Sequence, residues 1–238
     1  MDGSDMPESQ TVNPNAEGFV MSRGMKFPKD PRFIKGRIRG ALRQRRYELK
    51  ETEAVLKTVR EGDVVIELGA GIGYMSTLVA SKRNIKSVHA FEANPALVPY
   101  IKSVHAANNL SNAHVVHGIL GKRKGTVDFY VRGNLLASSM MPFEGENDPT
   151  IEKVNVLNAK QVFKDIEPSV LICDIEGAEA DLLPELDLST LRAAIVELHP
   201  QYIGPEGVNK VFRAFMDGGL AYYHRASTNK VVCFRRGW

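Results

Sequence analysis

The chain has 238 residues, a formal net charge of +3 and 43% hydrophobic residues, values that suit a globular protein of one or two domains. No apolar stretch reaches the ~18 residues that a membrane span requires. The two cysteines, Cys173 and Cys233, are too few for a disulfide framework. Residues 1–31 are polar and lack a signal-peptide pattern, so we expect a disordered tail and a cytoplasmic protein.

The positive charge is concentrated near the start of the chain. Residues 32–50 hold eight Lys and Arg residues against one acid, Glu48. We expect residues 32–60 to form a basic helical segment that covers the functional site, and residues 61–238 to form the main domain. A solvated helix face is favoured over a nucleic-acid interface, because aromatic residues that stack on bases are nearly absent from this run.

Strands and helices alternate after residue 60. Apolar runs predict strands, and amphipathic segments that follow turn signals predict helices. The expected strands are 64–68, 86–92, 114–119, 170–174 and 192–199, and the expected helices are 74–82, 95–108, 178–186 and 206–217. This alternation is typical of an α/β doubly wound, mostly parallel sheet that binds ligands at the carboxyl edge.

Other segments are additions to that pattern. Two last strands, 220–225 and 230–236, predict an antiparallel edge. We expect strand 126–131 to form a hairpin with the strand before it, and residues 151–157 and 158–165 to form a strand and a short helix. The loop 133–150 is rich in breakers and apolar residues, and it is interpreted as a lid.

A glycine-rich loop joins the first expected strand to its helix. Glu67 ends an apolar run, and Gly69, Gly71 and Gly73 follow on alternate positions. Glycines let a ligand approach the backbone, and the helix N-terminus beyond them offers free N–H groups. In the dinucleotide fingerprint the third glycine falls at the position that Tyr74 occupies here. The spacing therefore favours a nucleoside cofactor without a pyrophosphate.

Acidic residues end several of the expected strands. Glu92 ends the second strand, where an acid can accept hydrogen bonds from ribose hydroxyls. Asp174 ends the fourth strand, and Glu197 and His199 share a face at the end of the fifth. Acids gathered at one sheet edge need cations or raise each other's pKa. The structural alternative is that they cap the helices that follow.

Several blocks in order resemble the FkbM family of S-adenosylmethionine (SAM) methyltransferases. They are Gly69–Tyr74, Phe91–Pro95, Leu120-Gly121, Asp174–Glu179 and Val196–His199. The resemblance implies a Rossmann-like class I fold with a seven-stranded sheet, and O-methylation of a hydroxyl on a small metabolite such as a sugar or polyketide. It implies SAM as cofactor and S-adenosylhomocysteine as product.

By the same resemblance, the cofactor-binding residues are those of the glycine loop and of three strand ends. They are Glu67, Gly69, Gly71, Gly73, Tyr74, Glu92, Ala93, Asn94, Gly118, Ile119 and Asp174. The expected catalytic residues are His199 as general base, Glu197 holding its tautomer, and Asp174 as the alternative base. A divalent metal held by these three side chains is a less favoured alternative.

Two other activities stay open at this point. They are N-methylation of a small amine and, less favoured, NAD(P)-dependent oxidoreduction. The expected partner is a small-molecule methyl acceptor; nucleic acid is not favoured, and the sequence leaves homo-oligomerisation open. A scaffold role without turnover is disfavoured by the acids at the strand ends.

Overall fold

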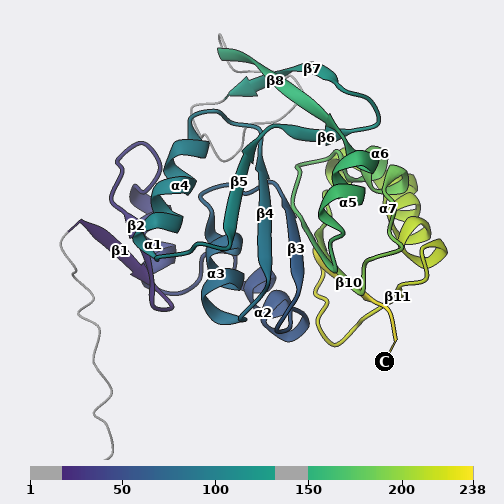
Figure 1. Ribbon diagram of the computed structural model, residues 1–238, viewed down its shortest axis with the longest axis horizontal. Helices are drawn as coiled ribbons and strands as arrows, with labels where there is room; N and C mark the ends of the chain where they lie inside the picture. The colour runs from purple at the N-terminus through teal and green to yellow at the C-terminus, as the bar shows by residue number, and fades with distance from the viewer. Residues whose placement is uncertain (1–17, 132–149, 238) are drawn as a thin grey trace, which may run out of the picture. The chain divides into compact units, whose positions relative to one another are not determined.

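The computed structural model describes residues 18–131 and 150–237. The chain divides into two compact units, Met1–Tyr47 and Glu48–Trp238. The described part of the first unit consists of a β-hairpin, formed by β1 (Phe19–Ser22) and β2 (Met25–Pro28), and the helix α1 (Gly36–Arg43). Figure 1 labels these elements at the purple end of the chain.

The hairpin corrects the expectation that residues 1–31 are disordered. Arg23 and Gly24 both have positive φ angles, 50° and 80°, as a two-residue hairpin turn of type I′ requires. Val20 lies opposite Phe27 in the register, and both side chains are buried. The alternation around an Arg-Gly pair was the missed signal. Residues 1–17 lie outside the described residues.

The expected basic helical segment, residues 32–60, contains two separate helices. α1 ends at Arg43, and α2 (Leu49–Thr58) begins after Glu48. Arg45 and Glu48 both adopt left-handed backbone conformations, with φ angles of 58° and 43°. Such residues interrupt a right-handed helix. The covering role expected for residues 32–60 stays a prediction.

The second unit is built on a seven-stranded sheet with the order β11-β12-β10-β9-β3-β4-β5. Its strands are β3 (Val64–Leu68), β4 (Ser87–Glu92), β5 (Ala113–His117), β9 (Val170–Cys173), β10 (Ala193–Glu197), β11 (Ala221–Tyr222) and β12 (Val231–Arg235). Five of them are parallel, and β12 and β11 form an antiparallel edge. The α/β fold class is therefore confirmed. The chain order reverses between β3 and β9, so a ligand is expected beyond their carboxyl ends.

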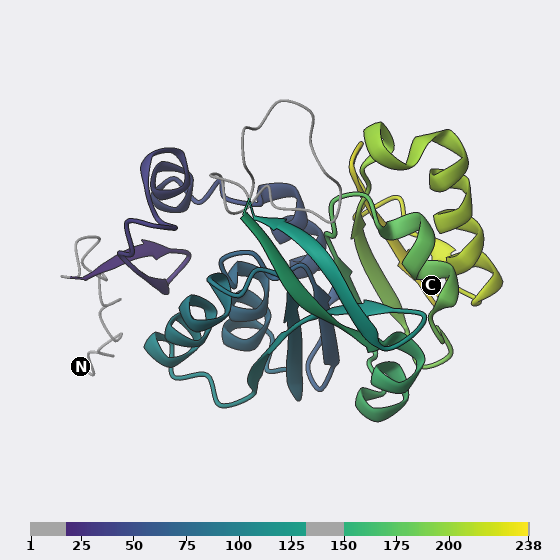
Figure 2. The same cartoon turned by 90° about the horizontal axis from the view of Figure 1, so that it is seen from above.

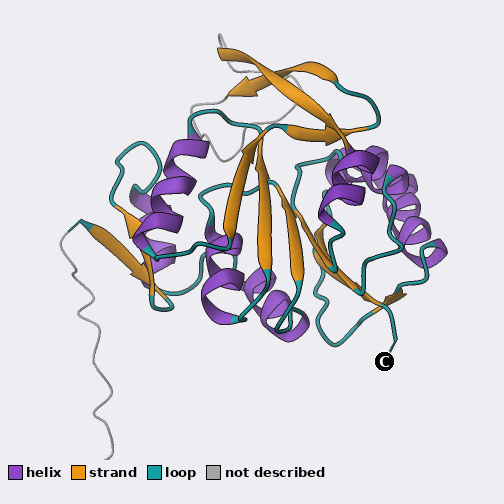
Figure 3. Cartoon of the chain, viewed as in Figure 1, coloured by secondary structure: helices purple, strands orange, loops and turns teal. Residues whose placement is uncertain are grey.

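Helices cover both faces of this sheet (Figures 2 and 3). They are α2, α3 (Tyr74–Lys82), α4 (Leu97–Ala107), α5 (Ala159–Ile166), α6 (Glu179–Leu182), the 3₁₀ turn η2 (Leu183–Glu185) and α7 (Pro200–Asp217). Ile66 and Leu68 join a core with α5, η2 and α7, in which Phe215 stacks on Phe234 at 4.4 Å. Successive strand side chains alternate between faces, so Glu67 lies on the opposite face, toward α3.

A smaller sheet corrects one pairing. β7 (Gly125–Val131) does not pair with β5. It pairs antiparallel with β8 (Thr150–Asn158), and β6 (Ile119–Gly121) pairs parallel with the end of β8. Figure 1 shows this smaller sheet past the carboxyl end of β5. The prediction paired β7 with the strand that precedes it in sequence. In the structure, β8 is the partner of both β6 and β7. The expected lid, 133–150, lies outside the described residues except for Thr150, where β8 begins.

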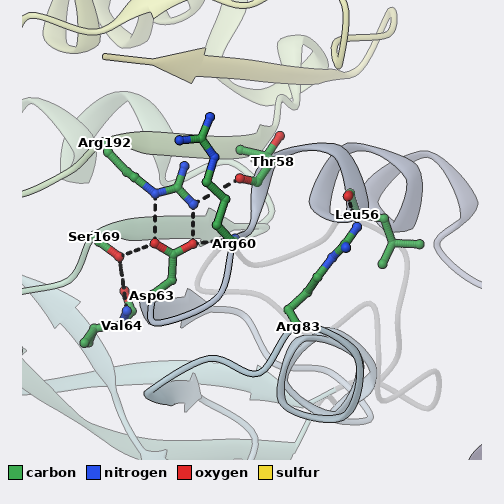
Figure 4. Close-up of polar contacts among 8 residues, drawn as sticks. All are labelled: Leu56, Thr58, Arg60, Asp63, Val64, Arg83, Ser169 and Arg192. Atoms are coloured by element: carbon green, nitrogen blue, oxygen red, sulfur yellow. Dashed lines mark hydrogen bonds and ion pairs between the residues drawn. The ribbon is translucent and has the colours of Figure 1, made fainter. Parts of the chain in front are cut away.

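A polar cluster ties the amino ends of three central strands together (Figure 4). Asp63, just before β3, accepts hydrogen bonds from Arg192 Nε and from Ser169 Oγ, both at 2.8 Å. Arg192 Nη2 also bonds Asp63 and the carbonyl of Thr58. Arg192 precedes β10 and Ser169 precedes β9. We call Asp63, Ser169 and Arg192 the amino-edge clasp.

Among the described residues, none of the helices has the length and apolar character needed to cross a bilayer.

Candidate cofactor and catalytic site

The glycine loop packs too closely for side chains at two of its positions. Gly69 has a φ angle of 85°, and a Cβ there would lie 1.8 Å from the carbonyl oxygen of Asp174. Gly73, at the start of α3, has a φ angle of 73°, and its Cβ would meet Ile101 Cγ2 at 2.8 Å. Glycine is therefore required at Gly69 to bring the ends of β3 and β9 together, and at Gly73 to let the start of α3 pack against α4.

Glu92 connects this loop to the loop after β4. Its Oε2 accepts the N–H of Gly71 and its Oε1 accepts the N–H of Asn94, both at 2.8 Å. Burial raises the pKa of Glu92 to about 7, although these N–H bonds oppose the shift. The backbone N–H groups of Ala93 and Ala70 also interact with the Glu92 carboxylate. Its expected contact with ribose hydroxyls stays a prediction.

The other residues expected at the nucleoside lie at the ends of β4 and β5. Asn94 uses its side-chain oxygen to accept the N–H of Ala96 at 3.0 Å, just before α4. The Ala93 carbonyl lies 3.1 Å from the ring of His117. The N–H of Gly118 donates to the Glu92 carbonyl at 2.9 Å, which places Ile119 directly after this junction. Tyr74 is fully buried at the start of α3.

A small pocket opens at the point where the chain order reverses. It is lined by Glu48, Glu51, Glu67, Gly69, Met75, Ile172, Cys173, Asp174, Ile195 and Glu197. Five of these residues are acids, and the described lining includes no Lys or Arg. The pocket therefore favours a ligand that carries positive charge.

Glu67 is the most buried of these acids. Only 2% of the residue is exposed, and its Oε2 makes no hydrogen bond among the described residues. Burial raises its pKa to about 8, a hydrogen bond with Ser76 opposes the shift, and the charges of Glu92 and Asp174 add to it. An orphaned buried oxygen is costly, so it marks a position where a ligand donor or water is expected.

His199 lies at the centre of the remaining acids. Its Nδ1 is 2.7 Å from Glu179 Oε1. Its Nε2 is 3.3 Å from Glu176 Oε2, 3.7 Å from Asp174 Oδ1 and 4.0 Å from Glu197 Oε1. The structure thus brings together the three side chains expected to be catalytic. Glu179, which sequence reasoning gave no role, makes the shortest of these contacts.

The charge state of His199 differs from what a general base requires. Burial lowers its pKa, but the hydrogen bond with Glu179 and the charges of Glu176, Glu179 and Asp174 outweigh burial and raise it to about 9. An imidazole with this pKa holds its proton at neutral pH and cannot accept another. The role expected for Glu197, orienting the ring, falls to Glu179.

Asp174 combines a raised pKa with a buried oxygen that has no hydrogen bond within the described part of the chain. Burial, together with the charges of Glu197 and Glu176, raises its pKa to about 8. Its Oδ1 is buried without a hydrogen bond among the described residues, while 36% of the side chain stays exposed to the pocket side. Glu176 has a φ angle of 50°, a conformation that costs free energy in a non-glycine residue and clusters at functional sites. This bend brings Glu176 to His199.

Asp174, Glu197 and His199 also have the spacing of a metal site. One ligand atom from each lies within 4.8 Å of the others. Because the protonated imidazole already supplies a cation to these carboxylates, a metal ion would have to displace that proton. The less favoured metal alternative therefore stays a prediction.

Comparison with known proteins yields a family-model match over part of the chain. The model of the TRM5/TYW2 methyltransferase domain matches residues 44–130, a range that includes the glycine loop, Glu92 and Gly118. An uncharacterized protein of Methanocaldococcus jannaschii is 25% identical over 132 residues, which cover 54% of this chain. The chain spans about half the length of this curated relative, 49%.

Solved structures share the fold at low sequence identity. Trm5b of Pyrococcus abyssi has a TM-score of 0.52 and 15% identity, over 91% of this chain and 55% of its own. TYW2 of M. jannaschii, solved in complex with AdoMet, has a TM-score of 0.50 and 15% identity, over 93% and 88%. A methyltransferase of Pyrococcus furiosus has a TM-score of 0.50 and 16% identity, over 91% of each chain.

Fold, pocket and family-model match define the class: the chain carries a SAM-dependent methyltransferase domain. Within that class, the matched model is that of TRM5/TYW2, so the expected resemblance to the FkbM family is wrong. Trm5 and TYW2 proteins act on tRNA. This finding overturns the expectation of a small-molecule acceptor without nucleic acid, and the oxidoreductase alternative falls with it.

The pocket suits the cofactor of this class. SAM carries a sulfonium and an ammonium group. The buried oxygens of Glu67 and Asp174 make no hydrogen bond among the described residues, and both face a pocket lined by acids. A cationic ligand would satisfy both oxygens.

Proposed function

We propose that the protein transfers the methyl group of SAM to a nucleotide of tRNA. The observation that carries the proposal is the acid-lined pocket at the carboxyl ends of β3 and β9. It lies in a domain whose residues 44–130 match the TRM5/TYW2 methyltransferase model. The match supports tRNA as the acceptor, since that is the substrate of those proteins.

The cofactor is held by residues at three strand ends. Glu92, at the end of β4, accepts hydrogen bonds from the ribose hydroxyls. Glu67 and Asp174 face the positive charges of the methionine part. When bound, SAM supplies a methyl group already activated by its sulfonium, so the chain contributes orientation and the exclusion of water.

Proton transfer is assigned to Asp174. When ionised, a carboxylate with a pKa near 8 is well matched to accepting a proton close to neutral pH. His199 keeps its own proton, held at Nδ1 by Glu179. Its positive charge stabilises the ionised carboxylates of Glu176 and Asp174 around it, so His199 is a positioning residue.

The proposal is tested by methyl transfer from SAM labelled in the methyl group to unmodified tRNA transcripts. We expect label in the RNA and none in a mixture of sugars and hydroxylated small molecules. Asp174→Asn should lower the rate constant of transfer about 100-fold or more while S-adenosylhomocysteine still binds in calorimetry. Glu206→Gln, an exposed acid on α7, is the control and should transfer normally.

Two outcomes would contradict the proposal. If no RNA is labelled although S-adenosylhomocysteine binds, tRNA is not the acceptor. If neither SAM nor S-adenosylhomocysteine produces heat on titration or raises the melting temperature, the pocket is not the cofactor site.

A further inference from the structure

The first unit contains buried apolar side chains. Around the hairpin β1–β2 and helix α1, the buried apolar side chains are Val20, Met25, Phe27, Phe33, Ile34 and Leu42. Arg23 Nη2 donates to the carbonyl of Arg45 at 3.1 Å, which links the hairpin turn to the end of α1. Residues 18–47 are thus an ordered element that presents a defined surface.

That surface is strongly positive. Residues 18–47 contain ten Lys and Arg residues and a single acid, Asp30, so their net charge is +9. Asp30 is already paired with Arg32 at 2.6 Å. Six basic side chains are exposed and take no part in any ion pair within residues 18–131 and 150–237; they are Lys35, Arg37, Arg39, Arg43, Arg45 and Arg46. We call these six residues the basic patch.

The arrangement of these charges opposes the stability of α1. Lys35 is the N-cap and Arg37 lies in the first turn, where the helix dipole favours acids, and the first turn contains none. Lys35, Arg39 and Arg43 follow at intervals of four residues, so like charges lie one above another on one face. An anionic partner would turn these unfavourable contacts into favourable ones.

The composition of the patch indicates what kind of anion it suits. Phe27 and Phe33 are buried, so they offer no platform on which bases can stack. Arginine, which supplies five of the six side chains, binds phosphate through paired N–H donors. A surface of this kind reads the phosphates of a folded nucleic acid and leaves the bases to another site.

We propose that residues 18–47 form a docking module that binds the phosphate backbone of a structured RNA through the basic patch. The inference rests on the proposed function for its partner, since it assigns the module to the tRNA substrate of the methyltransferase domain. Binding is independent of base sequence, and the domain supplies the selectivity for the nucleotide that is modified.

The test measures binding of a fluorescein-labelled tRNA transcript to the full-length protein by anisotropy, over a series of salt concentrations. The variant carries Arg37→Gln, Arg39→Gln and Arg43→Gln. A second variant carries Lys35→Gln, Arg45→Gln and Arg46→Gln. The control removes the same charge from exposed lysines of the second unit, with Lys82→Gln, Lys102→Gln and Lys164→Gln.

We expect each patch variant to weaken binding about 10-fold or more. The slope of log Kd against log salt should become shallower by about 1 for every phosphate that the variant no longer neutralises. The control should keep the wild-type slope. Binding of S-adenosylhomocysteine should be unchanged in all three proteins, because none of the substitutions touches the pocket. Melting temperatures of the variants verify that they are folded.

Several outcomes overturn the inference. They are wild-type tRNA affinity and slope in both patch variants, equal losses in the control, or binding to vesicles of phosphatidylglycerol in place of tRNA. Failure of the proposed function is distinguishable. If the patch variants lose tRNA binding but no tRNA is methylated by the wild type, the docking module stands and the acceptor assignment fails. If the wild type methylates tRNA and both patch variants bind tRNA normally, the acceptor assignment stands and the docking module fails.

Discussion

His199 and Glu179 form a buried pair, with Nδ1 and Oε1 2.7 Å apart and only 4% and 0% of the two residues exposed. The pair turns Nε2 toward Asp174, Glu176 and Glu197 at the carboxyl edge of the sheet. It makes His199 a fixed positive charge among acids.

Glu179→Gln should lower the pKa of His199 from about 9 toward its ordinary value of about 6.5. The substitution removes the hydrogen-bonded carboxylate and leaves the burial that disfavours the imidazolium. NMR titration of the His199 ring measures the pKa directly. Glu206→Gln is the control and should leave it unchanged. A pKa still near 9 in Glu179→Gln would show that the other acids alone hold the proton.

The free energy of unfolding of the cofactor-free protein should fall as the pH rises. Between pH 4.5 and 8 the folded protein retains a proton on Glu67 that the unfolded chain has released. Between 6.5 and 9 the same is true of His199. Each retained proton contributes at most about 1.4 kcal/mol per pH unit.

Urea titrations at several pH values measure this slope. Glu67→Gln should flatten it over the lower range, because the amide does not titrate. The ammonium group that SAM and S-adenosylhomocysteine share takes the place of the Glu67 proton, so binding of S-adenosylhomocysteine should release protons and tighten toward pH 8. Stability that rises between pH 5 and 8 would contradict the assignment.

Gly69→Ala should abolish cofactor binding and destabilise the fold by about 2 kcal/mol or more. The added methyl group would overlap the Asp174 carbonyl, and the positive φ angle at position 69 disfavours alanine. Gly40→Ala in α1 is the matched control, since a Cβ there meets nothing within 4 Å. That change should stabilise the helix by about 0.5–1 kcal/mol. If Gly69→Ala and Gly40→Ala show the same cofactor affinity in calorimetry and the same melting temperature, the close approach of Gly69 to the Asp174 carbonyl is refuted.

Asp63→Asn should destabilise the protein by about 3 kcal/mol, because it breaks the amino-edge clasp and leaves Arg192 without its carboxylate. Affinity for S-adenosylhomocysteine should stay within about twofold, since the clasp lies at the opposite ends of the strands from the pocket. Asp30→Asn, which breaks an exposed ion pair, should leave the melting temperature unchanged. A loss of affinity in Asp63→Asn would show that the two edges are coupled.

Removal of divalent metal should leave methyl transfer unchanged. The His199 imidazolium already neutralises the carboxylates that would bind an ion. The measurement is the rate of transfer after dialysis against EDTA and after the return of Mg²⁺ or Mn²⁺. Activity that disappears with EDTA and returns with a metal would contradict this prediction.

The alternation of strands and helices predicted the sheet well, because buried parallel strands are short apolar runs that end in recognisable loops. The same pattern placed Asp174, Glu197 and His199 at one edge. Pairing between distant segments, such as β7 with β8, left no local signal. The hairpin at Arg23-Gly24 did have a local signal, the alternation of apolar residues around this pair. That signal was overlooked because it lies next to a polar tail.

Charge states were the part of the site that sequence reasoning missed. His199 was expected to be a base from its ordinary pKa, but the buried Glu179 and the bend at Glu176 surround it with acids. These depend on three-dimensional proximity. The prediction of the partner was wrong for a related reason. The sequence blocks that suggested a small-metabolite enzyme belong to the cofactor-binding half of the fold, which carries little information about the methyl acceptor.

The amino-edge clasp has a consequence for how this fold can diverge. Asp63, Ser169 and Arg192 join β3, β9 and β10 by contacts that involve no residue of the pocket. Substitutions among the carboxyl-edge loops therefore meet a scaffold that is already secured from the other end. A lineage built on this scaffold is free to exchange one methyl acceptor for another while its strands stay in register.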